Sequence, residues 1–149
     1  MSDSVRNPPG ECGAHGLAPM LHVVDVDRAV RFYELLGFVP GAPLRDPAGR
    51  SFYCAMRAED SHVMFTRASG PVNSAEQAVL LYMYSVDVGT LRRHLLAHGV
   101  RDGGRYGGGS RAACPEGVVF EPAFPFYMQK GEIRIEDPEG YCILVGQLE

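Results

Sequence analysis

Two histidines and two glutamates are the residues of this 149-residue chain whose types best suit metal chemistry. His22 and His62 lie in the first half, whereas Glu132 and Glu136 lie near the end. Two imidazoles and one carboxylate form a ligand set that suits several divalent metals. His22 alone could also act as a general base near neutral pH, but the sequence shows no partner for it. A displaced metal centre, a catalytic histidine and a structural histidine are therefore the alternatives.

The other histidines and the cysteines suggest less chemistry. His94 and His98 are spaced to share one helical face, and without a third ligand we expect that face to meet solvent. The cysteines form no CxxC pair and follow no charged and then apolar leader, so we expect free thiols in a cytoplasmic protein. They are Cys12, Cys54, Cys114 and Cys142.

Composition excludes two classes of partner. The formal net charge is −4 and the pI is about 5.7, and no basic block is longer than Arg92 and Arg93. This distribution argues against nucleic acid binding. No apolar run approaches the roughly 18 residues that would cross a bilayer, so we expect no membrane partner.

One strand-to-helix passage occurs twice, as "HVVDVDRAVRFYELLGFV" in the first half and "YSVDVGTLRRHLLAHGV" in the second. In this alignment Asp25 corresponds to Asp87, and Gly37 corresponds to Gly99. Aspartate is a favourable N-cap, and glycine commonly follows the last turn of a helix. Each passage therefore predicts a strand followed by an Asp-capped helix that ends at glycine.

The elements around these passages predict an α+β fold of two tandem βαβββ modules. Antiparallel and mixed strands should form curved sheets around a cleft. We assign residues 1–16 to a flexible N-terminal arm, 17–68 to the first module, 69–78 to a linker and 79–149 to the second module. The glycine- and proline-rich segment 102–125 is either a surface loop or a segment that crosses a site or a partner.

Two strings carry a resemblance to a known family. "APMLHVVDVDRAVRFYELLGF" and "IRIEDPEGYCILVG" resemble the vicinal oxygen chelate superfamily, which contains glyoxalases, bleomycin-resistance proteins and dioxygenases. The resemblance covers residues 17–147 as one domain and is greatest to the bleomycin-resistance branch. It implies a divalent ion on the concave sheet, held by His or Gln on the first strand of each module and by Glu on the last strand.

The residues at those positions do not suit a metal. The positions that correspond to the expected ligands hold Ala18, Leu80 and Leu144, and the fourth would be Met64 or Phe65. Hydrocarbon side chains offer no lone pair to a cation. We therefore predict no metal, no other cofactor and no catalytic residue.

Strand alternation then defines which side chains line the cleft. The predicted ligand-binding residues are Ala18, Met20, His22, Leu80, Tyr82, Tyr84, Cys142 and Leu144. The residues predicted to face the helices are Leu17, Leu21, Val79, Leu81, Ile143 and Val145. Tyrosine, methionine and histidine offer stacking surfaces and polar groups to a flat or aromatic molecule. Tyr82 and Tyr84 could instead pack at a dimer seam.

The carboxylates near the closing hairpin leave two interpretations open. Glu132, Glu136 and Asp137 could attract a cationic ligand, or they could form a solvated strand face beside Ile133 and Ile135. Asp137 belongs first of all to the turn "DPEG".

The combined prediction is a cytoplasmic homodimer that sequesters a small organic molecule, cationic or aromatic, without a metal. The alternative is a metal-dependent lyase, isomerase or dioxygenase of the same superfamily with displaced ligands. A third hypothesis is a protein-interaction module, which no residue pattern supports.

Overall fold

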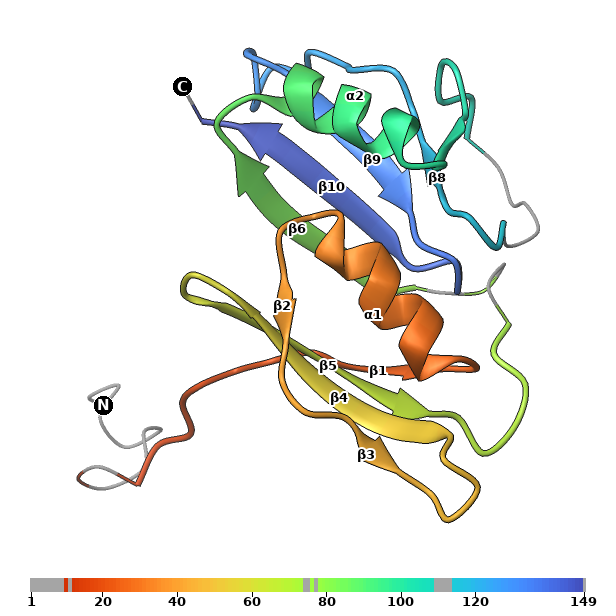
Figure 1. The fold of residues 1–149 in the computed structure, drawn as a ribbon. Helices are drawn as coiled ribbons and strands as arrows, with labels where there is room; N and C mark the ends of the chain where they lie inside the picture. Colours follow the sequence, from red (N-terminus) through yellow and green to blue (C-terminus); the bar gives the residue numbers. More distant parts are fainter. Residues whose placement is uncertain (1–9, 11, 74–75, 77, 109–113, 149) are drawn as a thin grey trace.

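The computed structural model describes residues 10, 12–73, 76, 78–108 and 114–148. It contains two mixed β-sheets, each covered on one face by one helix (Figure 1). The predicted α+β fold of two modules is confirmed.

The first sheet contains the first half of the chain. Its elements are β1 (Met20–Val23), α1 (Val26–Glu34), β2 (Val39–Pro40), β3 (Leu44–Arg45), β4 (Ser51–Ala58) and β5 (Ser61–Arg67). The strand order is β1-β5-β4-β2, and β3 also pairs with β4. β1 is parallel to β5, whereas β4 and β5 form an antiparallel hairpin. We call this unit sheet A.

The second sheet repeats this arrangement. Its elements are β6 (Leu80–Ser85), α2 (Val88–Ala97), β7 (Arg101–Asp102), β8 (Val118–Val119), β9 (Glu132–Glu136) and β10 (Cys142–Gln147). The strand order is β6-β10-β9-β8-β7, with β6 parallel to β10 and β9 antiparallel to it. The first strand of each module thus pairs in parallel with the last strand of the same module. We call this unit sheet B.

The repeated helix signals behave as the sequence predicts. Oδ1 of Asp25 and Oδ1 of Asp87 each accept a hydrogen bond of 3.0 Å from the amide three residues later. Gly37 and Gly99 have φ of 100° and 94°, a left-handed conformation that glycine adopts without steric cost. Both helices are therefore held by the same pair of terminal interactions.

The core lies between each sheet and its helix. Its fully buried members include Val23, Tyr33, Phe65, Ile133, Ile135 and Ile143. The inward orientation predicted for Leu21, Ile143 and Val145 is confirmed, and Leu81 packs partly buried against the core. The same prediction is wrong for Leu17 and Val79, whose exposed fractions are 97% and 51%. Both residues precede their strands, which begin at Met20 and Leu80, so strand alternation does not extend to them.

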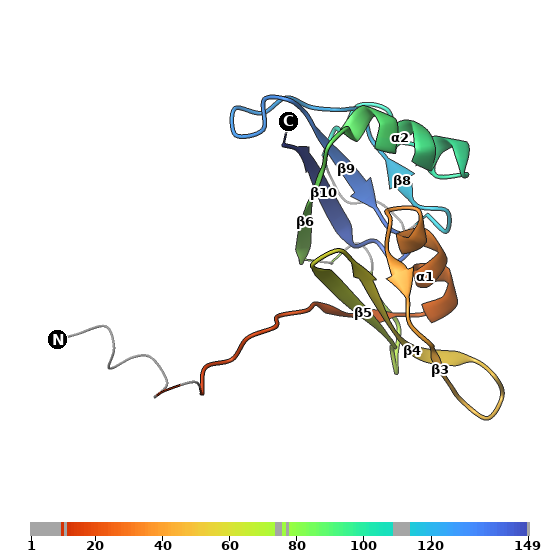
Figure 2. The ribbon, with the colours of Figure 1, turned by 60° about the vertical axis from the view of Figure 1, so that its left-hand side comes forward.

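Both helices lie on the same side of the molecule, so the uncovered faces of both sheets are turned toward the other side (Figure 2). The described residues before β1 extend away from the body on that side. We call the uncovered surfaces the open faces of sheets A and B. Among the described residues no helix is long and apolar enough to cross a membrane.

The turn between β9 and β10 connects the second module to the first. Oδ2 of Asp137 accepts a hydrogen bond of 2.8 Å from the phenol of Tyr33 on α1. Glu139 accepts from the amide of Val24 at 2.9 Å and pairs with the guanidinium of Arg28. Asp137 does form the predicted turn, but it is only 2% exposed, so the solvated-face interpretation is wrong for it.

Part of the segment 102–125 packs on the open face of sheet B. It contains β8, which pairs with β9, and a small buried cluster of Cys114, Val118 and Phe120. The ring of Tyr106 lies 5.2 Å from that of Phe120. The open face of sheet B is therefore covered on its β8 side and left uncovered along β6.

Candidate functional site

The open face of sheet B presents a strip of apolar side chains along β6. Exposure alternates along this strand, and Leu80, Tyr82 and Tyr84 point outward with exposed fractions of 60%, 40% and 59%. The parallel register with β10 places Cys142 beside Leu80 and Leu144 beside Tyr82. The structure thus brings these five predicted ligand-binding residues onto one face.

β9 contributes three charged residues to this face, Glu132, Arg134 and Glu136. Its register with β10 places Glu136 beside Cys142, Arg134 beside Leu144 and Glu132 beside Gly146. Glu132 is 8% exposed, and the solvated-face interpretation is therefore wrong for it. A buried carboxylate requires hydrogen-bond partners.

Two tyrosines supply those partners. The phenol of Tyr82 donates to Oε2 of Glu132 at 2.5 Å, and the phenol of Tyr127 donates to Oε1 at 3.2 Å. Burial and the Glu132 carboxylate both raise the pKa of Tyr82, and the same two causes raise the pKa of Tyr127. Both phenols consequently remain protonated donors across the neutral pH range.

Arg134 lies between Glu132 and Glu136 on β9. Its guanidinium carbon lies 4.1 Å from the centroid of the Tyr106 ring, a cation–π contact. Its Nε lies 3.6 Å from Oε1 of Glu136. The contact with Tyr106 lies on the side of the face that the segment 102–125 covers.

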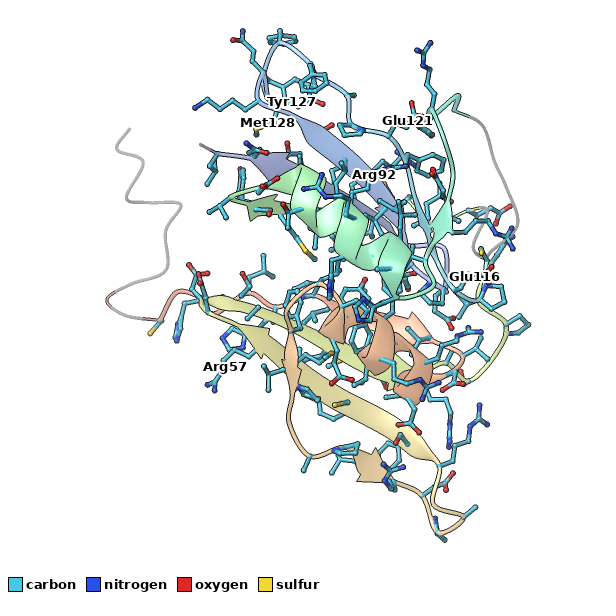
Figure 3. All side chains as sticks on the ribbon, turned by 45° about the horizontal axis from the view of Figure 1, so that its top comes forward. Arg57, Arg92, Glu116, Glu121, Tyr127 and Met128 are labelled. Carbon is cyan, nitrogen blue, oxygen red and sulfur yellow. The ribbon has the colours of Figure 1, made fainter. Side chains whose placement is uncertain are left out.

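The side chain of Met128 packs against the backbone of Gly146 on the open face of sheet B. A Cβ at Gly146 would lie 2.6 Å from Cε of Met128 and 2.8 Å from the phenol oxygen of Tyr82. Glycine is therefore required at this position for both groups to approach the sheet. Met128 and Tyr127 lie together on the segment that leads into β9 (Figure 3).

A groove of about 760 Å³ runs along β6. Its walls are residues 36–38 after α1, the β4–β5 turn at residues 58–61, residues 82–86 and Leu148. Tyr82 and Tyr84 are the predicted ligand-binding residues that line it. The acidic pair Glu59 and Asp60 borders it, and Glu59 has the left-handed φ of 52°.

The predicted residues of the first module lie elsewhere. Met20 is 53% exposed and His22 is exposed, both on the open face of sheet A, where they pair with Met64 and Thr66 of β5. Ala18 precedes β1 and is half-buried. None of these three residues lines the groove along β6.

The imidazole of His22 forms no hydrogen bond to a described residue, so no orienting partner for a general base is found there. Within the described residues no three His, Cys, Asp or Glu side chains lie close enough to hold a metal ion. The displaced set of His22, His62 and Glu132 or Glu136 is therefore not assembled within that part of the chain.

The remaining histidines and the thiols follow the sequence predictions. His94 on α2 and His98, the residue that follows α2, are both exposed, with ring centroids 4.3 Å apart. Cys54 and Cys142 are buried free thiols, as predicted, and burial raises the pKa of both. Neither thiol is therefore activated as a nucleophile.

Comparison with known proteins identifies the family. The model of the glyoxalase/bleomycin resistance protein/dioxygenase superfamily matches residues 17–145. The chain belongs to this superfamily. No curated protein sequence matches it.

Several solved structures share the fold of this chain. A bleomycin-binding protein complexed with bleomycin is 18% identical with a TM-score of 0.64, and the alignment covers 91% of this chain and 100% of that one. The bleomycin-binding protein from bleomycin-producing Streptomyces verticillus, complexed with copper(II)-bleomycin, is 19% identical with a TM-score of 0.63. The alignment covers 92% of this chain and 98% of that one. TnmS3, an antibiotic binding protein from Streptomyces sp. CB03234, is 17% identical with a TM-score of 0.61. The alignment covers 94% of this chain and 100% of that one.

The structure shows where two positions lie that the family resemblance equates with metal ligands, those of Leu80 and Leu144. Leu80 and Leu144 occupy neighbouring strands of the open face of sheet B, where Leu144 pairs with Tyr82, two residues after Leu80. Both side chains are hydrocarbon and offer no electron pair to a metal. This part of the open face therefore presents apolar surface where the family resemblance places a chelate.

Sequence reasoning missed Arg134, Tyr127 and Met128 as members of the site. The alternation of "EIRIE" with inward Ile133 and Ile135 was a usable signal for Arg134, because it places the charged residues on the open face. No comparable signal existed for Tyr127 and Met128, since they lie on a connection without regular structure.

Proposed function

We propose that this protein binds and sequesters a small organic molecule on the open face of sheet B, without a metal and without chemical turnover. The observation that carries the proposal is the exposed strip of Leu80, Tyr82 and Tyr84 on β6, of which Tyr82 and Tyr84 line the 760 Å³ groove. Apolar and aromatic surface with a few polar groups is typical of small-molecule sites. Sequestration requires no activated nucleophile or acid–base pair.

The relatives give the proposal a first probe. Two of the similar structures are bleomycin-binding proteins, and a third is an antibiotic binding protein. Titration with bleomycin and with copper(II)-bleomycin by calorimetry tests whether this chain takes a ligand of that kind. A panel of smaller aromatic molecules, screened by NMR, covers ligands that differ from bleomycin.

Tyrosine variants locate the binding. Tyr82→Ala and Tyr84→Ala should each weaken binding of a ligand found in these screens by at least about tenfold, with the fold retained in circular dichroism. Phe52→Ala, on β4 and outside the groove, is the matched control and should leave the affinity within about twofold. Unchanged affinity in both groove variants would place the ligand elsewhere and contradict the proposal.

We also propose that the protein is a homodimer in which the open faces contribute to the interface or to a shared cleft. Support comes from Met20, Tyr84 and Phe126, which are 53%, 59% and 86% exposed. Light scattering coupled to gel filtration measures the mass directly. If Tyr84→Ala dissociates the dimer but leaves ligand affinity intact, the tyrosine belongs to the seam and not to the ligand site.

Metal analysis separates sequestration from the enzymatic alternative. Protein purified and dialysed without chelator should contain no stoichiometric Zn, Mn, Ni or Fe. A metal that survives dialysis at one equivalent per chain would overturn the metal-independent proposal and favour a lyase, isomerase or dioxygenase with displaced ligands.

A further inference from the structure

A buried carboxylate lies beneath aromatic rings at one end of the open face of sheet B. Glu132 is 8% exposed and accepts hydrogen bonds from Tyr82 and Tyr127. Among the described residues, no arginine, lysine or histidine nitrogen forms an ion pair with it. Burying an uncompensated carboxylate is unfavourable, because its hydration is lost without a cation to replace it.

The rings around Glu132 remain accessible. Tyr82 and Tyr84 lie with ring centroids 5.4 Å apart, and Tyr127 makes an edge contact with Phe126, also at 5.4 Å. Tyr127 is 56% exposed and Phe126 is 86% exposed. The two phenols point their hydrogens at Glu132, and the exposed parts of both side chains remain accessible to a ligand.

This arrangement of Glu132 and the tyrosines favours a ligand that carries a positive charge. A phenol that donates to a carboxylate is polarised, which makes its oxygen and its ring face more electron-rich. Electron-rich ring faces attract cations, and the sulfur of Met128, which approaches Gly146 and Tyr82, is a soft neighbour for an alkylated ammonium. An anionic group would be repelled by Glu132, and a neutral apolar group would gain nothing from the buried charge.

We infer that the bound molecule carries an organic ammonium group, which contacts the rings of Tyr82, Tyr84 and Tyr127 above Glu132. The inference rests on the proposed binding function and names the chemical class of the ligand. It accounts for the buried charge, because the ligand supplies the cation that no described residue provides for Glu132.

A purely structural role of Glu132 is the competing explanation. In that case the carboxylate would only anchor the Tyr127–Met128 segment by accepting two hydrogen bonds. Glu132→Gln separates the two roles. The amide oxygen still accepts a phenol hydrogen bond and the side-chain shape is kept, whereas the negative charge is removed.

The test uses two probes of the same shape, choline and 3,3-dimethylbutan-1-ol, which differ by a quaternary nitrogen in place of a carbon. Chemical-shift titration of the full chain should show choline binding about tenfold more tightly than the alcohol. Glu132→Gln should remove this preference with the free energy of unfolding largely retained. Tyr84→Leu should weaken choline more than the alcohol.

Glu121→Gln provides the matched control. Glu121 is exposed on the connection between β8 and β9 (Figure 3), and its replacement removes the same charge from the chain. The choline preference should persist in this variant, because long-range attraction is screened by salt.

Three results would overturn the inference. Equal affinity for the two probes excludes recognition of charge, and so does a choline preference that survives Glu132→Gln. If neither probe binds while a neutral aromatic ligand binds at Tyr82 and Tyr84, the ammonium class is wrong and the proposed function stands. If no molecule in any screen binds, the proposed function itself fails.

Discussion

Oε2 of Glu139 lies 2.5 Å from Nη2 of Arg28, a residue 111 positions earlier in the chain. The side chain of Glu139 is 2% exposed and that of Arg28 is 31% exposed, so the pair is largely shielded from water. Together with the Tyr33–Asp137 hydrogen bond, this contact attaches the turn of the second module to helix α1 of the first. We call these four residues the inter-module clasp.

The first prediction is that the clasp holds the two modules together as one cooperative unit. Glu139→Ala leaves the Arg28 guanidinium and the Val24 amide without their partner and should lower the free energy of unfolding by about 2 kcal/mol. Urea unfolding followed by tyrosine fluorescence and by circular dichroism measures this change. Glu121→Ala, an exposed carboxylate outside the clasp, should change stability by less than about 0.5 kcal/mol. Equal losses in both variants would show that the clasp contributes nothing specific.

A second prediction concerns the close approach at Gly146. A methyl group there would collide with Met128 and with the phenol oxygen of Tyr82. Gly146→Ala should therefore displace both groups, lower stability by about 1–3 kcal/mol and weaken ligand binding. Thermal unfolding and calorimetric titration measure the two effects.

Gly70→Ala is the control for this substitution. A Cβ at Gly70 meets nothing within 4 Å, so stability should change by no more than about 0.5 kcal/mol. If Gly146→Ala behaves like Gly70→Ala, Met128 does not depend on glycine for its position.

The repeated modules were predictable from sequence because their signals are local. Asp25 and Asp87 cap helices through amides three residues away, and Gly37 and Gly99 end them through backbone conformation. Neither effect depends on the rest of the fold. The alternation of Leu80, Tyr82 and Tyr84 is local in the same sense.

The contacts that assemble the site were not predictable, because they join distant residues. Asp137 reads as a turn residue in the sequence, yet it accepts a hydrogen bond from Tyr33, 104 positions away. Glu132 shares its alternation with solvated strand faces, and only the tertiary structure brings Tyr82 and Tyr127 to its carboxylate. Burial of a charged residue depends on what covers it, and local pattern does not contain that information.

The third prediction compares the two equivalent helix caps. Asp25→Ala and Asp87→Ala each remove the acceptor for an amide at the start of a helix. Each should lower the free energy of unfolding by about 1 kcal/mol, within the usual range for N-caps. Chemical denaturation measures both. Asp60→Ala, in a turn and not at a helix, should have a smaller effect, and a larger loss there would argue against capping as the cause.

The fourth prediction is a pH dependence of stability that arises at Asp137. Burial is the largest cause that raises the pKa of this carboxyl from 3.8 to about 6, opposed by hydrogen bonds from Tyr33 and from the amides of Glu139 and Tyr141. Because the folded chain binds this proton more tightly than the unfolded chain does, protonation favours the folded state. The contribution of Asp137 to stability is therefore fully present below about pH 4 and is lost as pH rises through 6.

Asp137→Asn makes this contribution measurable, since the amide is neutral at every pH and still offers an oxygen to the turn amides. The free energy of unfolding of the wild type, relative to Asp137→Asn, should rise by up to about 3 kcal/mol between pH 7 and pH 4, which is the equivalent of about two pKa units. Asp87→Asn is a control of opposite sign. Hydrogen bonds from Thr90 lower the pKa of Asp87, so the wild type should lose its advantage over that variant as pH falls. A flat difference for Asp137→Asn across this range would show that the carboxyl titrates in the folded chain as it does in the unfolded chain, and that burial between α1 and the β9–β10 turn does not affect its ionisation.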